Sequence, residues 1–229
     1  MTHIQTAGGN RLELPLEDGP VRRHFSDPAS HTDTILRQIN DEKIYEPVFR
    51  GRRDLIFVDI GANVGLVSLY AQDVCRFILA VEPSPHFSLL EKLCGHYPHI
   101  LFIQVAMAPR NEPVTLRLCD GNTTGHSLIH KFPGSDLAVP GETLKTILEN
   151  YVLFPRVDLV KVDVEGAEYD CLTEMEIGAC RTRVQSYFVE THEPDPSRRV
   201  SDRDRMIARF TRCGYHATPL ADDRFIASL

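Results

Sequence analysis

From residue 55 onward, short runs of aliphatic and β-branched residues alternate with segments in which apolar residues recur every three or four positions. This alternation is typical of βαβ units around a parallel sheet. The apolar runs predict strands at residues 55–60, 77–82, 100–106, 157–164 and 185–191. The intervening patterns predict helices at residues 64–73, 85–97, 142–150, 167–175 and 202–213. We therefore expect an α/β fold, with a central, mostly parallel sheet and helices on both faces.

Two segments depart from this alternation. An additional strand is predicted at residues 112–118, before the polar loop 120–127, and the chain ends in a predicted hairpin with strands at 215–220 and 225–229. A nicotinamide-binding domain normally closes its sheet with another parallel strand, so an antiparallel hairpin at the end of the chain disfavours that class.

Residues 1–50 are expected to form a cap on a second unit, residues 51–229. Within the cap, a glycine-containing turn divides residues 4–16 into a small predicted hairpin, and apolar residues at helical spacing predict a helix at 32–49. The first 30 residues match no known motif, and substrate selection is the role expected of them.

Composition narrows the function classes. The chain has 229 residues, of which 42% are hydrophobic and 25% charged, so it can bury enough apolar surface to fold as a globular domain. A net charge of -7 gives no overall attraction for nucleic acid or anionic lipid, and the longest apolar runs are far short of the roughly 20 residues that span a bilayer. The six cysteines lack the spacing of a metal site, and the N-terminus shows no export signal. We expect a cytoplasmic protein that acts on neither nucleic acid nor membrane, and a homodimer is compatible with these properties.

The most informative segment is a predicted strand that ends in an acid and runs into a turn, Val-Asp-Ile-Gly-Ala-Asn-Val-Gly at residues 58–65. Gly61 permits a tight bend and the approach of a ligand, and Gly65 permits close helix packing. Asn63 stands where the dinucleotide fingerprint G-x-G-x-x-G has its second glycine, which disfavours a pyrophosphate cofactor. Asp59 suits a ligand with an ammonium group. A plain strand-to-helix turn with a capping side chain is the alternative.

A second predicted strand also ends in an acid, Glu82, 23 residues after Asp59. A carboxylate at this place can accept hydrogen bonds from both ribose hydroxyls of an adenosine. Pro83 and Ser84, which follow it, extend the predicted cofactor contact. The alternative is that Glu82 caps the following helix. Together the two acids favour a cofactor that contains adenosine but no pyrophosphate.

A third strand carries charged residues on one face. Strand alternation places Lys161, Asp163 and Glu165 together. Ionisable groups on an otherwise apolar strand are costly unless they are paired or used, and Asp163 lies at the carboxyl end of the sheet, where ligands bind. A structural arrangement, with Lys161 paired to Asp163 and Glu165 capping the next helix, stays open. Glu168 is expected to be a first-turn helix charge.

The next strand ends in Glu190 and His192, which share one face. A histidine that is neutral near physiological pH beside carboxylates is a candidate general base. His192 is therefore the first choice for that role and Asp163 the second, while His126 in the polar loop is a weaker alternative. Oxygen ligands for Mg²⁺ are also available, from Asp163, Glu165 and Glu193. No bound metal is nevertheless expected.

These segments together resemble the FkbM-type methyltransferases. The matching stretches are Val-Asp-Ile-Gly-Ala-Asn-Val-Gly at 58–65, Val-Glu-Pro at 81–83, Asn-Thr-Thr-Gly-His-Ser at 122–127, Glu-Thr-Leu at 142–144 and Val-Asp-Leu-Val-Lys-Val-Asp-Val-Glu-Gly-Ala-Glu at 157–168. The resemblance implies a Rossmann-like class I methyltransferase fold, to which the terminal hairpin conforms, and S-adenosylmethionine as cofactor. By position it implies cofactor contacts from Asp59, Gly61, Asn63, Gly65 and Glu82, with Ala106 near the adenine. Pro83, Ser84 and Asp163 are further candidates for cofactor contacts.

The leading hypothesis is an S-adenosylmethionine-dependent O-methyltransferase that acts on a hydroxyl of a sugar or small natural product. Its catalytic candidates are His192, Asp163, Glu165, Glu190 and Lys161. The alternatives are an NAD-type oxidoreductase on a similar sheet and a non-catalytic cofactor-binding module. The missing pyrophosphate fingerprint disfavours the first alternative, and the intact set of acids and glycines disfavours the second.

Overall fold

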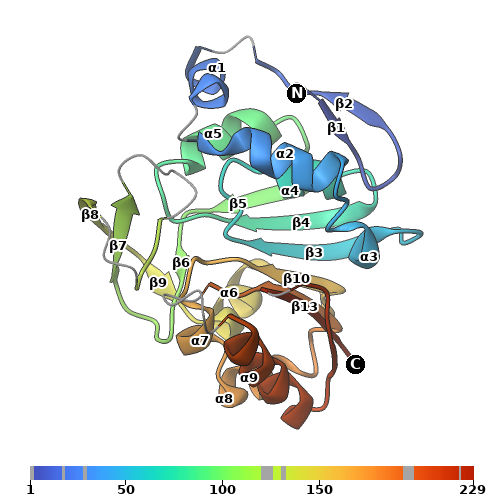
Figure 1. The fold of residues 1–229 in the computed structure, drawn as a ribbon, viewed down its shortest axis with the longest axis vertical. Helices are drawn as coiled ribbons and strands as arrows, with labels where there is room; N and C mark the ends of the chain where they lie inside the picture. The colour runs from blue at the N-terminus through green and yellow to red at the C-terminus, as the bar shows by residue number, and fades with distance from the viewer. Residues whose placement is uncertain are drawn as a thin grey trace.

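The computed structural model describes residues 3–16, 19–27, 30–119, 126–129, 133–192, 199–221 and 223–229. Its centre is a seven-stranded sheet in the order β12-β13-β11-β10-β3-β4-β5 (Figure 1). The strands are β3 (Leu55–Ile60), β4 (Cys75–Val81), β5 (Ile100–Ile103), β10 (Leu159–Val162), β11 (Ser186–Glu190), β12 (His216–Pro219) and β13 (Arg224–Ser228). Strand β13 runs antiparallel to both of its neighbours and the other pairings are parallel, which confirms the predicted sheet and its terminal hairpin.

The order of the strands reverses between β3 and β10. From β3 the chain proceeds outward through β4 to β5, and it then returns to place β10 on the other side of β3. In an open parallel sheet, such a reversal leaves a crevice at the carboxyl ends of the two strands, where ligands bind. The glycine turn of residues 58–65 follows β3, and the acid-rich segment of residues 157–168 continues beyond β10.

Helices cover both faces of the sheet, as predicted (Figure 1). One face carries β1 (His3–Gln5), β2 (Arg11–Glu13), α1 (Gly19–Ser26), α2 (Thr32–Asn40), α3 (Glu46–Phe49), α4 (Leu66–Ala71) and α5 (Phe87–Cys94). The other face carries α6 (Leu144–Tyr151), α7 (Glu168–Cys171), α8 (Glu174–Cys180) and α9 (Arg199–Arg212). The N-terminal elements therefore share a hydrophobic core with the sheet: Ile4, Val21 and Leu36 pack in one cluster with Phe57.

Strand alternation decides which polar residues face the N-terminal elements. Phe57 of β3 and Leu159 of β10 pack on that side of the sheet. Asp59 and Lys161, two positions further along the same strands, point to the same side and are register partners. The sequence thus places an acid and a lysine between the sheet and the N-terminal cap.

Two predicted helices are each divided in the structure, so both predictions of a continuous helix are wrong. Residues 167–175 contribute to α7 and α8, because Thr173 has an extended backbone and its hydroxyl accepts a hydrogen bond from the backbone N–H of Glu176, which starts a new helix. Residues 32–49 form α2 and α3, and Lys43 between them adopts a φ of 54°. Apolar spacing alone reveals neither interruption.

The strand predicted at 112–118 is present as β7 (Val114–Cys119), and it pairs with a strand that the sequence does not predict, β8 (Gly134–Val139). The small, polar residues that begin β8 give no apolar run. A second unpredicted pair joins β6 (Ala106–Met107) to β9 (Gly141–Glu142), so the predicted strand 100–106 ends early. In the described part of the chain, none of the helices is long and apolar enough to cross a membrane.

Candidate functional site

A cavity opens at the carboxyl ends of β3, β4, β10 and β11, where the strand order reverses. Predicted site residues that line it are Gly61, Asn63, Glu82, Pro83, Ala106, Lys161, Asp163, Glu165, Glu190 and His192. The cap closes the opposite wall with residues that the sequence analysis missed, namely His31, Thr34, Ile35, Gln38 and Tyr45. Three predicted cofactor residues are not among the lining residues: Asp59, Gly65 and Ser84.

The glycine turn after β3 holds two parts of the chain together. Gly61 has a φ of 78°, and a Cβ atom at this position would lie 1.8 Å from the backbone oxygen of Asp163. Gly61 is therefore needed for the close approach of the ends of β3 and β10, whatever contact it also makes with a ligand. Gly65 has a φ of 88° and lies against Leu90 and Cys94 of α5, so it permits packing between helices.

Asp59 lies fully buried beneath the cavity and acts on a lysine. Its Oδ2 accepts a hydrogen bond of 2.8 Å from the Ser68 hydroxyl, and its Oδ1 lies 3.3 Å from Nζ of Lys161. The Lys161 ammonium also lies 3.2 Å from Oδ2 of Asp163 and donates to the backbone oxygen of Gly61. Burial opposes the charge on Lys161, but the two aspartates outweigh burial and raise its pKa well above the usual value. Asp59 and Lys161 thus fix Asp163 relative to the glycine turn.

Glu82 is held by the backbone on both sides. Its Oε2 accepts a hydrogen bond of 2.8 Å from the N–H of Asn63, and its Oε1 accepts one of 2.9 Å from the N–H of Ser84. Burial raises the pKa of Glu82, and these hydrogen bonds offset part of that effect. Because a carboxylate oxygen can accept more than one hydrogen bond, each oxygen keeps capacity for a ligand hydroxyl.

These groups fit the adenosine part of S-adenosylmethionine. Glu82 offers a fixed carboxylate for the two ribose hydroxyls at the cavity wall. Beside it, Oδ1 of Asn63 is buried and has no hydrogen-bond partner among the described residues, so it is available to a polar group of a ligand. Val105 and Ala106 line the same part of the cavity with apolar surface.

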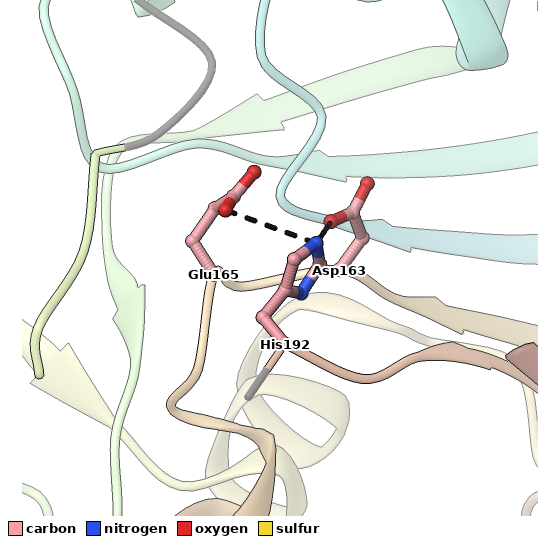
Figure 2. Close-up of side chains that lie close together, drawn as sticks. All are labelled: Asp163, Glu165 and His192. Atoms are coloured by element: carbon pink, nitrogen blue, oxygen red, sulfur yellow. Dashed lines mark ion pairs between the residues drawn. The ribbon is translucent and has the colours of Figure 1, made fainter. Parts of the chain in front are cut away.

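At the other end of the cavity, acids surround His192 (Figure 2). The Nε2 atom of His192 lies 3.8 Å from Oδ1 of Asp163 and 3.7 Å from Oε2 of Glu165. On the far side of the ring, Nδ1 lies 3.0 Å from Oε1 of Glu168. Glu190 lines the cavity nearby and is paired with Arg224 at 3.1 Å.

The expectation that His192 is neutral near physiological pH disagrees with these surroundings. Burial opposes its charge, but the hydrogen bond that His192 donates to Glu168, together with the charges of Glu165 and Asp163, raises the pKa of His192 well above its usual value. These surroundings favour the protonated form of the imidazole. A protonated imidazole cannot accept a proton, so His192 does not fit the role of general base in this state.

The carboxyl groups around His192 differ in their pKa. Burial raises the pKa of Glu165 to about 8, because His192 compensates for the lost hydration only in part. Burial would also raise the pKa of Asp163, but Lys161 and then His192 outweigh it and hold that pKa below its usual range. Glu165 has a φ of 53°, a left-handed conformation that is strained for a residue with a side chain and that often marks a functional site.

Glu168, expected from the sequence to be only a first-turn helix charge, is part of the site. It is fully buried, and its oxygens accept hydrogen bonds from the N–H groups of Val164 (3.0 Å) and Gly166 (2.9 Å) as well as facing His192. It therefore orients the imidazole in addition to capping a turn.

The His126 ring lies in the cavity wall and stacks on His86, with ring centroids 5.1 Å apart. Glu193 and residues 120–125 lie outside the described part of the chain.

Comparisons with known proteins bear on this geometry. A family model described as the methyltransferase FkbM domain matches residues 59–217. The comparison with curated proteins gives no match. Among solved structures, the precorrin-6y C5,15-methyltransferase of Geobacter metallireducens is 12% identical with a TM-score of 0.51, and the alignment covers 83% of this chain and 88% of that one. The fibrillarin pre-rRNA processing protein of Methanococcus jannaschii is 13% identical with a TM-score of 0.49, covering 77% and 67%.

At such identities, the likeness to the precorrin enzyme shows a shared class I methyltransferase fold and nothing finer. The family match covers well over half of the chain and includes the glycine turn, Glu82, the acid-rich strand and His192. It confirms the predicted methyltransferase activity and S-adenosylmethionine as the cofactor, in preference to the NAD-type alternative. This chain belongs to the FkbM family of S-adenosylmethionine-dependent methyltransferases.

Proposed function

We propose that the enzyme methylates a hydroxyl oxygen of a sugar or small natural product. The observation that carries the proposal is the position of the acids: Asp163, Glu165 and Glu190 line the same cavity as Glu82, the residue expected to bind the cofactor ribose. A hydroxyl loses its proton when it is methylated, so an acceptor of this kind needs a proton acceptor beside the reacting oxygen. The end of the cavity around His192, here called the acid end, offers the carboxyl groups of Asp163 and Glu190 for this step.

Bound S-adenosylmethionine supplies the methyl group on its sulfonium. The chain positions the two reactants and takes up one proton. Positioning contributes most, because well-oriented reactants recover about 7–11 kcal/mol of a barrier, whereas a general base contributes about 10²–10⁴-fold in rate. In this arrangement a carboxylate at the acid end accepts the hydroxyl proton and His192 does not. Asp59 and Lys161 are positioning residues that hold Asp163.

We also propose that residues 1–50 serve as a cap that selects the acceptor. Thr34, Ile35 and Gln38 of α2 line the cavity and offer both apolar and hydrogen-bonding surface. Tyr45 extends this wall, and its ring packs on Phe188 of β11 at 5.0 Å between centroids. The enclosure by the cap favours a small acceptor or the end of a glycan over a large folded substrate.

The test has two stages. Thermal unfolding is first measured with S-adenosylhomocysteine, with NAD and with buffer; a ligand at 100 times its dissociation constant stabilises a protein by about 2.7 kcal/mol, so only the first should shift the midpoint. Panels of hydroxylated sugars and natural products, with amine counterparts as controls, are then incubated with enzyme and S-adenosylmethionine. Methyl ethers identified by mass spectrometry and NMR support the proposal, whereas methylated amines alone contradict it.

A further inference from the structure

The acid end of the cavity contains more donor groups than proton transfer requires. One carboxylate suffices to accept a hydroxyl proton, yet two carboxylates and an imidazole converge there on one point (Figure 2). The separations of 3.8 Å and 3.7 Å between Nε2 of His192 and the oxygens of Asp163 and Glu165 are longer than hydrogen bonds. These atoms face one another without forming direct hydrogen bonds.

We infer that Asp163, Glu165 and His192 form a binding site for one divalent transition-metal ion. Its role in the reaction rests on the proposed function, but the site itself is argued from geometry. One donor atom from each residue lies within 4.8 Å of the others. Metal–nitrogen and metal–oxygen bonds are about 2.0–2.2 Å long, so a single ion can contact donors that are 3.7 Å and 3.8 Å apart.

The second observation is the support behind the imidazole. A histidine that binds a metal usually donates its other ring N–H to a carboxylate or carbonyl, which fixes the ring and its tautomer. Glu168 stands at Nδ1 of His192 at 3.0 Å and is itself held by two backbone N–H groups. With the Nδ1 proton directed to Glu168, a neutral His192 presents the lone pair of Nε2 to Asp163 and Glu165.

The charges around the site also favour a cation. Lys161 is shared between Asp59 and Asp163, and Arg224 is paired with Glu190. Among the described residues, these cations are thus already committed, whereas Glu165 faces the ring of His192 alone. A divalent ion between these side chains would compensate the charge of the carboxylates.

The donor set selects the kind of ion. Mg²⁺ and Ca²⁺ prefer oxygen ligands, while an imidazole beside two carboxylates suits a first-row transition ion such as Mn²⁺. Such an ion would attract the hydroxyl oxygen of the acceptor and make its proton more acidic. The O–H bond would then break as the proton passes to a carboxylate that lines the cavity, such as Glu190. The oxygen forms its bond to the methyl carbon as the S–CH₃ bond breaks, leaving a neutral thioether.

The experiment measures Mn²⁺ binding directly. Metal-free protein is titrated with Mn²⁺, and the electron paramagnetic resonance signal of free Mn²⁺ is recorded. Wild type should bind one ion per chain, and Mg²⁺ should displace it only in large excess. Glu165→Gln and His192→Ala should each weaken binding at least tenfold, and Glu168→Gln should weaken it about 10–100-fold. Glu91→Gln, an exposed acid on α5, is the matched control and should bind like wild type.

Circular dichroism checks that each variant is folded. If His192→Ala does not fold, the near-isosteric Glu165→Gln still tests the metal site. Unchanged Mn²⁺ affinity in both variants, or no binding by wild type, overturns the metal site. Calorimetry with S-adenosylhomocysteine in the presence of a chelator separates this result from the proposed function. Cofactor binding and hydroxyl methylation without Mn²⁺ binding overturn the metal site alone, whereas Mn²⁺ binding without any hydroxyl acceptor upholds the site and overturns the proposed function.

Discussion

Among the histidines that line the cavity, His86 and His192 have pKa values that their surroundings move in opposite directions. Burial, with His24 and His126 beside it, lowers the pKa of His86 to about 3. Burial also disfavours a charged His192, but the hydrogen bond that it donates to Glu168 and the charges of two further carboxylates raise its pKa well above the usual value. Burial thus favours the neutral form of His86, whereas the neighbouring carboxylates favour the charged form of His192.

The difference divides the cavity into two ends with distinct physical properties. At the cofactor end, Glu82 is fixed by backbone N–H groups and the nearby His86 is neutral, so binding depends on shape and hydrogen bonds. At the acid end, Asp163, Glu165 and His192 compensate one another by charge. Substitutions that damage one end and spare the other test this division.

The largest effect is expected where the two ends join, at Gly61. In Gly61→Ala the added Cβ would meet the backbone oxygen of Asp163, which neither side-chain rotation nor solvent can relieve. We expect the free energy of unfolding to fall by about 4–5 kcal/mol, a range reached by few substitutions, and cofactor binding and turnover to be lost together. Urea denaturation and calorimetry with S-adenosylhomocysteine measure the two losses.

Gly51→Ala is the matched control for that substitution. Gly51 also has a left-handed backbone, with a φ of 72°, but no atom lies within 4 Å of its added Cβ. It should therefore show only the cost of the backbone conformation, about 1–2 kcal/mol, with normal cofactor binding. Equal losses in the two variants would contradict the role of Gly61 in joining β3 to β10.

The next effect concerns the acid end alone. His192→Ala removes the group that lies between Asp163 and Glu165, and turnover should fall about 10–100-fold while cofactor affinity stays nearly unchanged. Asp163→Asn should impair both, because Asp163 also pairs with Lys161 beside the glycine turn. Single-turnover assays and calorimetry separate the two results. His96→Ala, at an exposed position, is the control, and an unimpaired His192→Ala enzyme would show that positioning alone suffices.

The elements at the cofactor end could be predicted from the sequence. The contacts between side chains at the acid end could not. Strand β3 spans the predicted residues because an apolar run bounded by polar residues and a glycine turn is decided locally. The contact between Glu168 and His192 joins residues 24 positions apart and depends on how α7 meets the end of β11. A first-turn helix acid looks the same in a sequence whether or not it orients a histidine.

The raised pKa of His192 and the cap residues that line the cavity were unpredictable for a related reason. A histidine pKa depends on the charges that the fold brings around it, and three acids surround His192 only in the folded chain. Residues of α2 reach the cavity from a segment without a recognisable motif, because the cap packs on the same face as Asp59 and Lys161.

A smaller effect is expected at the cofactor end. Glu82→Ala removes the carboxylate that can accept hydrogen bonds from both ribose hydroxyls, and hydrogen bonds to charged groups contribute about 1.5–3 kcal/mol each. Affinity for S-adenosylhomocysteine should fall at least tenfold, while the acid end keeps its raised His192 pKa. Calorimetric titration gives the affinity, and Glu91→Ala on the exposed face of α5 is the control. Wild-type affinity in a folded Glu82→Ala protein would remove Glu82 from the cofactor site.

The smallest effect tests the neutral histidine by the pH dependence of stability. Because the pKa of His86 is lowered to about 3 in the folded chain from an unfolded value of 6.5, the unfolded state binds more protons between these limits. Stability is therefore lost as the pH falls below the unfolded pKa. Between pH 7 and pH 5, His86→Gln should lose up to about 2 kcal/mol less stability than wild type, whereas His96→Gln, at an exposed position, should follow wild type. Urea denaturation at the two pH values measures the difference, and NMR should show no titration of the His86 ring in this range. Parallel losses in wild type and His86→Gln would mean that His86 titrates normally and that the two ends of the cavity are not divided by charge.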